Sequence, residues 1–246
     1  MRGRITAYLR FQLADFLLMR AALPATLVVF LAYMTLASAP ANVDWSARSG
    51  GARMLTQLFQ AVAGAFIVLG SFLGVARLVT DDRSNGYFRF LFSKPVSVVR
   101  FYAQQWVLHG VGLVAIAGLL GLWLEARTAA IPVGAAMTMM ALTWILVGGV
   151  GFALSAATNY DALLLVIAYV ASSVLQGIKG APDSLMAPWL REVTKLTLPV
   201  HKLDYIRAQL YTGGDLPWPA TLHVVAYGMT GFAAAIVLLR RTSLAR

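Results

Sequence analysis

Three widely spaced residues have the side chains of a hydrolase triad: His109, Ser155 and Asp161. In such a triad the histidine takes the proton from the serine, and the carboxylate orients the imidazole. The sequence lacks the Gly-x-Ser-x-Gly turn that often presents a nucleophilic serine, and no pair of acidic residues accompanies the histidine. Catalysis therefore stays an alternative, and we predict no catalytic residue.

The sequence contains no recognisable motif for a nucleotide or a metal ion. A phosphate-binding loop reads Gly-x-x-x-x-Gly-Lys followed by Ser or Thr, and neither glycine-rich stretch, Gly148 to Gly151 or Gly177 to Gly180, matches it. The chain has 0 cysteines, which excludes disulfides and thiolate metal sites. We therefore expect this chain to bind no cofactor and no metal, and any nucleotide hydrolysis to belong to another chain.

A polar stretch from Thr80 to Gln105 interrupts an otherwise apolar sequence. Thr80 is predicted to cap the start of a helix. Asp81 and Asp82 then lie in the first turn, where negative charge meets the positive end of the helix dipole. This stretch is where we expect contact with a soluble partner.

The middle of this stretch predicts a short amphipathic helix. Phe88, Leu91 and Phe92 stand at i, i+3 and i+4, so they share one face. Pro95 disfavours helical geometry at the residue before it, which ends the helix. Ser97 is predicted to start the next helical segment.

Long apolar runs surround this stretch and define the fold class. Of the residues, 59% are hydrophobic and 12% are charged, which is typical of an integral membrane protein. A membrane-crossing helix needs about 20 mostly apolar residues, and six runs without Lys, Arg, Asp or Glu are long enough. We predict an all-α integral membrane protein forming a single transmembrane domain, 1–246, with six spans: 21–39, 58–76, 101–124, 133–157, 162–178 and 220–239.

Positive charge predicts the orientation, because cytoplasmic flanks of membrane spans are rich in Lys and Arg. Twelve of the 20 basic residues flank the spans on the side that holds both termini. The N and C termini and the segment 80–97 are therefore predicted to be cytoplasmic, and the loop 179–219 extracytoplasmic. The twelve are Arg2, Arg4, Arg10, Arg20, Arg77, Arg83, Arg89, Lys94, Arg100, Arg240, Arg241 and Arg246.

The N-terminal residues 1–20 are predicted to form an interfacial amphipathic helix. Ile5, Leu9, Leu13 and Phe16 recur at helical spacing and alternate with polar residues. We expect this helix to lie along the inner membrane surface before turning at Pro24. The alternative is that it is simply the cytoplasmic start of the first span.

Small residues recur within the predicted spans, which favours close packing between helices in a membrane. They are Gly70 and Gly74 in the second span, Gly118 and Gly121 in the third, and Gly148, Gly149, Gly151, Ala153 and Ser155 in the fourth. His109 is the one ionisable residue well inside a run. We interpret it as a hydrogen-bonding link between helices or a residue near the inner boundary.

The polar stretch resembles the cytoplasmic loop of ABC-2 type permease subunits of ABC transporters. That loop carries an acidic residue, three residues, a glycine, an apolar stretch and then Pro-x-Ser. The matching residues are Asp82, Gly86, Phe90 to Phe92, Pro95 and Ser97. The family often has Glu at the first position and a basic residue after the serine, where this chain has Asp82 and Val98. A weaker likeness covers Pro199 to Gly213.

The resemblance implies that 80–97 is a coupling helix between spans two and three that docks into a separate ATPase subunit. It implies two ATPase copies that bind ATP and Mg²⁺, and a second permease subunit in a homo- or heterodimer. The family favours export, here of an amphiphilic, drug-like or lipid-linked substrate across the inner (cytoplasmic) membrane. The residues assigned to the ATPase contact are Asp81, Asp82, Arg83, Gly86, Phe88, Arg89, Leu91, Pro95 and Ser97; the substrate path is not assigned.

Two other functions stay open: a membrane assembly or scaffold subunit that carries no cargo, and an intramembrane enzyme built on His109, Ser155 and Asp161. The net charge of +10 is better explained by cytoplasmic flanks near the lipid bilayer than by nucleic acid. No basic stripe interleaved with aromatic residues supports nucleic-acid binding.

Overall fold

The structure is a computed structural model that describes residues 10, 12–38, 51–86, 97–128, 132–178 and 197–241. In these residues all regular structure is helical, as predicted. In chain order the elements are η1 (Phe16–Ala21), α2 (Ala22–Ser38), α3 (Gly51–Val75), α4 (Thr80–Ser84), α6 (Val98–Thr128), α7 (Val133–Thr143), η2 (Trp144–Gly148), α8 (Gly149–Ala157), α9 (Asp161–Ile178), α11 (Val200–Tyr211) and α12 (Trp218–Arg241).

Four stretches are long and apolar enough to cross a membrane: Thr56–Ser84, Val98–Ala126, Val133–Ala157 and Trp218–Arg241. The chain is therefore a membrane-like helical protein. The predicted first and fifth spans correspond to α2, with 17 residues, and to the shorter apolar helix Asp161–Leu175. Six spans, and the cytoplasmic position of both termini, stay predictions.

The helices group into two compact units. The first takes its described residues from Met1–Val75 and Ala103–Trp144, and the second from Ala76–Tyr102 and Ile145–Arg246. The boundary falls between α3 and α4, within the first turns of α6, and at the start of η2. The polar segment after α3 therefore belongs to the second unit.

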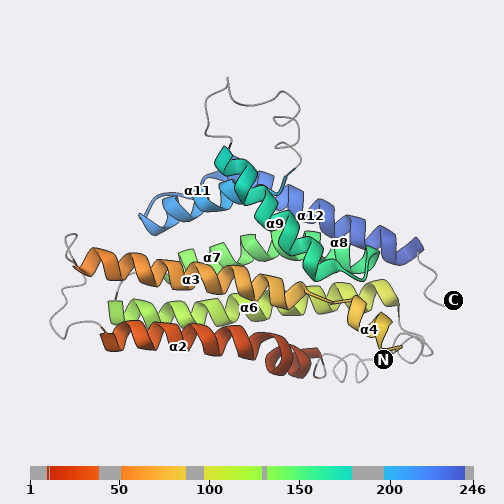
Figure 1. Cartoon of the computed structure of the whole chain (residues 1–246), viewed down its shortest axis with the longest axis horizontal. Coiled ribbons are helices and arrows are strands. Elements are labelled where there is room, and N and C mark those ends of the chain that lie inside the picture. The colour runs from red at the N-terminus through yellow and green to blue at the C-terminus, as the bar shows by residue number, and fades with distance from the viewer. Residues whose placement is uncertain are drawn as a thin grey trace. The chain divides into compact units, whose positions relative to one another are not determined.

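In the first unit, α2 and α3 run lengthwise beside each other (Figure 1). Glycines at two positions of α3 leave room for side chains of α6 and η2. A Cβ added at Gly70 would lie 3.2 Å from a methyl group of Leu113, and one at Gly74 would lie 2.9 Å from the indole of Trp144. The packing role predicted for these two glycines is confirmed.

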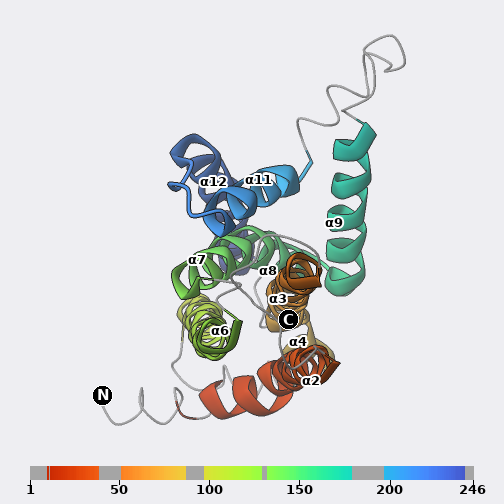
Figure 2. The same ribbon diagram turned by 90° about the vertical axis from the view of Figure 1, so that its left-hand side faces the viewer.

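The N-terminal segment begins before α2 and is helical where the structure describes it. Residues 12–15 lead through the π-helical η1 into α2, and Figure 2 shows this first segment, in red, at an angle to α2. Phe16 is fully buried, whereas Leu17 and Leu18 are exposed. The helix is continuous from 12 to 38, so Pro24 lies in its interior, where the ring of a proline crowds the carbonyl four residues earlier, here that of Arg20 in η1. The change of direction at η1 therefore lies where Pro24 would bend the helix.

In the second unit, α8 and α12 pack against each other through glycine. A Cβ added at Gly149 would overlap the carbonyl oxygen of Gly228, and one at Gly231 would lie 2.9 Å from the backbone of Gly149. The two backbones therefore touch directly at this crossing. Helix α9 packs on α8 and on α11, and α11 packs on α12 (Figure 2).

Candidate functional site

The polar segment that the sequence singles out begins with a sharp turn after α3. Arg77 has a φ of 59°, which is uncommon for a residue with a side chain. Helix α4 follows at once, with Asp81 and Asp82 in its first turn as predicted. Ser84, Asn85 and Gly86 are exposed at its far end.

The start of α4 is fastened to Ser155, which is fully buried in α8. The backbone N–H of Val79 donates to the Ser155 hydroxyl oxygen at 2.9 Å, and the N–H of Thr80 lies 3.4 Å from the same oxygen. These N–H groups belong to the N-cap and first residues of α4, which have no partner within their own helix. Ser155 therefore satisfies backbone groups that would otherwise be buried without a hydrogen bond.

The predicted capping role of Thr80 is wrong. The residue at the N-cap position is Val79, and no side chain caps the helix locally. The Thr80 hydroxyl instead donates to the carbonyl oxygen of Thr158 at 3.1 Å and lies 3.3 Å from the Ser155 hydroxyl. The Thr80 side chain is buried, and its hydroxyl bonds to α8 and to the connection between α8 and α9 instead of capping its own helix.

Two further hydrogen bonds join this segment to the end of α8 and the start of α9. The backbone N–H of Arg77 donates to the carboxylate of Asp161 at 2.7 Å. The guanidinium of Arg83 donates to the carbonyl oxygen of Ala156 at 2.9 Å. A cation at a helix C-terminus is favourable because the last carbonyls lack partners and carry the negative end of the dipole. The accompanying ion pair between Arg77 and Asp81, at 3.8 Å, is solvent-exposed and contributes little.

The base of α6 is linked to α4 from the other side. The phenol of Tyr102 donates to the carboxylate of Asp82 at 2.9 Å. Ser97 starts the helical segment that continues as α6, as predicted. Its carbonyl oxygen accepts a hydrogen bond from the N–H of Phe101 at 3.0 Å, and its hydroxyl oxygen lies 3.4 Å from the N–H of Arg100. Asp82 is thus held by a buried aromatic residue while remaining partly accessible.

The remaining predicted contact residues divide into two groups. Gly86 has a φ of 71°, and no atom lies within 4 Å of a Cβ added to it, so glycine is needed there for backbone conformation and not for space. Phe88, Arg89, Leu91 and Pro95 lie outside the described residues. The amphipathic helix predicted from them therefore stays a prediction.

The triad-type residues serve different contacts. Ser155 and Asp161 both hold the turn around Arg77 in the second unit. His109 belongs to the first unit, where its Nδ1 lies 2.7 Å from the carbonyl oxygen of Gly74 and its ring stacks on Phe16 at a centroid distance of 5.0 Å. In the described residues, no three His, Cys, Asp or Glu side chains are grouped to hold a metal ion.

His109 links two helices, as the sequence predicts. The carbonyl of Gly74 belongs to the last turn of α3 and has no partner further along its own helix. The guanidinium of Arg20 lies 3.4 Å from the neighbouring carbonyl, that of Leu73. Both side chains thus contact carbonyls at the C-terminal end of α3, and the histidine does so while fully buried.

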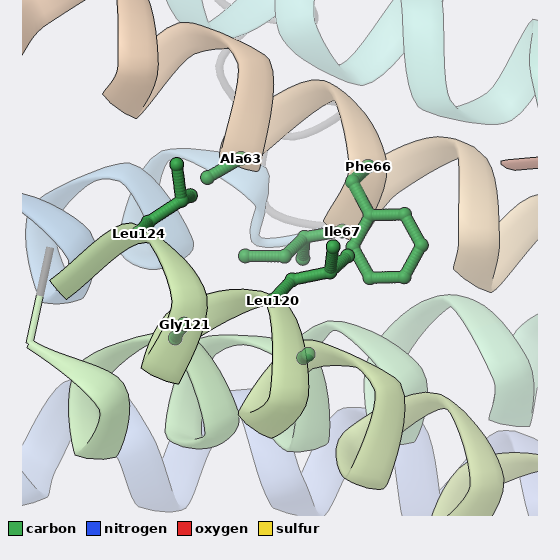
Figure 3. Close-up of a pocket in the computed structure, with 8 residues that line it drawn as sticks. Ala63, Phe66, Ile67, Leu120, Gly121 and Leu124 are labelled. Atoms are coloured by element: carbon green, nitrogen blue, oxygen red, sulfur yellow. The ribbon is translucent and has the colours of Figure 1, made fainter. Parts of the chain in front are cut away.

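A small cavity lies between α3, α6 and α7 in the first unit (Figure 3). Its volume is about 20 Å³, enough for roughly one water molecule. In the close-up, Phe66 and Ile67 of α3 face Leu120 of α6. A cavity of this size is a packing void and not a path for an amphiphilic cargo. All its lining residues are apolar or glycine: Ala63, Phe66, Ile67, Ala117, Leu120, Gly121, Leu124 and Ala136.

Sequence reasoning identifies the polar segment but misses the side chains that anchor it. Arg83 is among the residues assigned to the partner contact, yet it bonds to Ala156 in its own unit. Tyr102 falls within a predicted apolar span, where nothing marks it as a partner of Asp82. For glycine packing, Gly228 and Gly231 are missed, although their spacing within the last apolar run is the same kind of signal as that used for the earlier spans.

Comparisons with protein-family models, with curated proteins and with solved structures find no match to this chain.

Proposed function

We propose that this chain is the membrane-spanning permease subunit of an ATP-driven transporter of the ABC-2 type. In this proposal the segment 81–97 is a coupling helix that receives movement from a separate ATPase subunit. Two permease subunits, identical or related, would form the export path for an amphiphilic, drug-like or lipid-linked substrate in the inner (cytoplasmic) membrane. Two ATPase subunits would supply ATP binding and Mg²⁺.

The anchoring of α4 supports this role. A segment that transmits force must be fixed firmly to the helices it moves and exposed where the partner docks. α4 meets both requirements: the turn before it is bonded to Ser155 and Asp161 and its first residue, Thr80, to Thr158, whereas Ser84 to Gly86 are exposed. A loop that merely rested on a membrane surface would not need such bonds to the turn between α8 and α9.

The order of the motif supports the same role. Asp82, at the acidic position, is held by Tyr102, and Gly86 has the left-handed backbone that favours glycine. Ser97 precedes the long helix α6. Movement of the segment between Asp82 and Ser97 would therefore reach two elements at once. It would reach α6 through Ser97 and Tyr102, and it would reach the α8–α9 turn through Thr80 and Arg83.

The test is co-expression of the chain with ATPase subunits of ABC transporters from its own genome, followed by copurification and measurement of ATP hydrolysis in proteoliposomes. We expect Gly86→Arg and Phe88→Asp to reduce copurification, because they alter the docking surface. Gly213→Arg is the matched control, because Gly213 is also a glycine with positive φ, 78°, and a Cβ added to it would meet no atom within 4 Å.

A second pair of variants separates docking from force transmission. Thr80→Val and Arg83→Gln weaken the anchor of α4 and leave its exposed end intact. We expect the ATPase to copurify with these variants while its stimulation by the permease falls. Equal copurification and equal stimulation for the docking variants and Gly213→Arg would contradict the proposal.

A further inference from the structure

A groove opens between the first turns of α11 and α12, away from the polar segment that contains α4. Its volume is about 390 Å³, within the range of about 300–1,000 Å³ typical of small-molecule sites. Figure 2 shows α11 beside α12. The lining residues are His201, Lys202, Tyr205, Pro217, Pro219 and Ala220.

The packing of α11 explains which side chains reach the groove. Val200, Leu203 and Ile206 recur at i, i+3 and i+6 and are buried, so this face of α11 packs against its neighbours. The helix therefore presents Lys202 and Tyr205 toward the groove instead of the core.

The groove is positively charged. Lys202 is the residue with a full charge in its lining. The acidic side chains of this region do not line it. Asp204 forms an exposed ion pair with Arg207 at 2.9 Å.

The surroundings of the groove are those of a membrane boundary. α12 is one of the four stretches able to cross a membrane, and it begins at the groove. Trp218 is 64% exposed and Tyr205 is 53% exposed. Tryptophan and tyrosine concentrate at the level of the lipid headgroups, because their rings are apolar and their N–H or O–H groups are polar. The anionic groups fixed at that level are the phosphates of lipid headgroups.

We propose that the groove between α11 and α12 binds the phosphate headgroup of an anionic membrane lipid. Lys202 supplies the charge, and the Tyr205 hydroxyl supplies a hydrogen-bond donor. The prolines at 217 and 219 stiffen the wall and fix where α12 begins. This inference does not depend on the proposed transport function.

The experiment measures binding of a short-chain phosphatidylglycerol to the full-length chain in a neutral detergent. Short-chain phosphatidylcholine and inorganic phosphate serve as comparison ligands. We expect saturable phosphatidylglycerol binding that Lys202→Gln weakens at least about fivefold, since one basic residue near an anionic headgroup contributes about that factor. Lys202 is partly exposed, so the variant is expected to fold.

Arg207→Gln is the matched control, because it removes the same charge from the same helix but not from the groove. Affinity that falls with Lys202→Gln and is retained with Arg207→Gln supports the site. Equal losses in the two variants would show general charge attraction and overturn it. Binding of phosphatidylcholine or inorganic phosphate as tight as that of phosphatidylglycerol, or no saturable binding, would overturn it as well.

Discussion

Ser155 is the residue on which the position of α4 depends most, because it accepts hydrogen bonds from the N–H group of Val79 at 2.9 Å and of Thr80 at 3.4 Å. Ser155→Ala would leave buried N–H groups without a partner, at a cost of about 1–3 kcal/mol. We expect the unfolding temperature in detergent to fall by about 2–4 °C for each kcal/mol lost, measured by scanning fluorimetry.

The control for this prediction is Ser173→Ala. Ser173 is exposed on α9, and its hydroxyl bonds to the carbonyl of Tyr169 in its own helix, at 3.0 Å. Its replacement should leave the unfolding temperature nearly unchanged. A Ser155→Ala variant as stable as Ser173→Ala would contradict the anchoring role of Ser155.

For single residues, the sequence predicts where charged side chains lie in a helix better than it predicts their hydrogen-bond partners. The sequence places two acidic residues in the first turn of a helix, where the positive end of the helix dipole favours them, and the structure has both in the first turn of α4. The partner of Thr80 could not be predicted, because Ser155 and Thr158 are distant in the chain and reach it only through the tertiary fold. The same holds for Tyr102, whose hydroxyl finds Asp82 across a connection between two helices.

Among the elements, the crossing of α8 and α12 is the most sensitive to added volume. Gly228→Ala would place a methyl group against the backbone of Ile145 and Leu146, which cannot move aside as a flexible side chain can. We expect a loss of about 1–3 kcal/mol or more, from overpacking, and a lower unfolding temperature.

Gly134→Ala in α7 is the matched control, because no atom lies within 4 Å of a Cβ added there. Alanine also favours helix over glycine by about 1 kcal/mol, so this variant should be neutral or more stable. If both variants lower the unfolding temperature equally, the direct backbone contact between α8 and α12 is not what limits stability.

The helices themselves are largely predictable, because long apolar runs without charge leave few alternatives to a helix in a membrane. The runs beginning at 133 and 162 correspond closely to α7–α8 and to α9. The division of the fourth run by the π-helical η2 was not predictable, since no proline marks it. The bend at η1 lies in the turn before Pro24, where a proline distorts a helix, so Pro24 does mark it.

For the whole molecule, the orientation in the membrane is a prediction from the distribution of charge. The chain has 0 cysteines, so a cysteine introduced at a single position is the only target for a thiol reagent. Asn85→Cys and Asp215→Cys place that target at two exposed positions, one after α4 and one between α11 and α12. We expect a membrane-impermeant maleimide applied outside intact cells to label Asp215→Cys and not Asn85→Cys.

Inside-out vesicles should give the reverse labelling, which is the control for access to each position. The same side for both positions would contradict the predicted topology, because an extracytoplasmic loop and a cytoplasmic coupling segment cannot share a side. Sequence alone predicts the side of each loop but not the grouping of the helices into two units. That grouping depends on contacts such as those of Gly149 with Gly228.

The central claim is that the exposed end of α4 meets an ATPase. The most direct measurement places a photo-crosslinking amino acid at Asn85 in the full-length chain, in membranes of its own host, and identifies the adduct by mass spectrometry. We predict a crosslink to a nucleotide-binding subunit that is absent when the same group is placed at Asp215. No adduct with an ATPase at Asn85, or an equal one at Asp215, would contradict the claim.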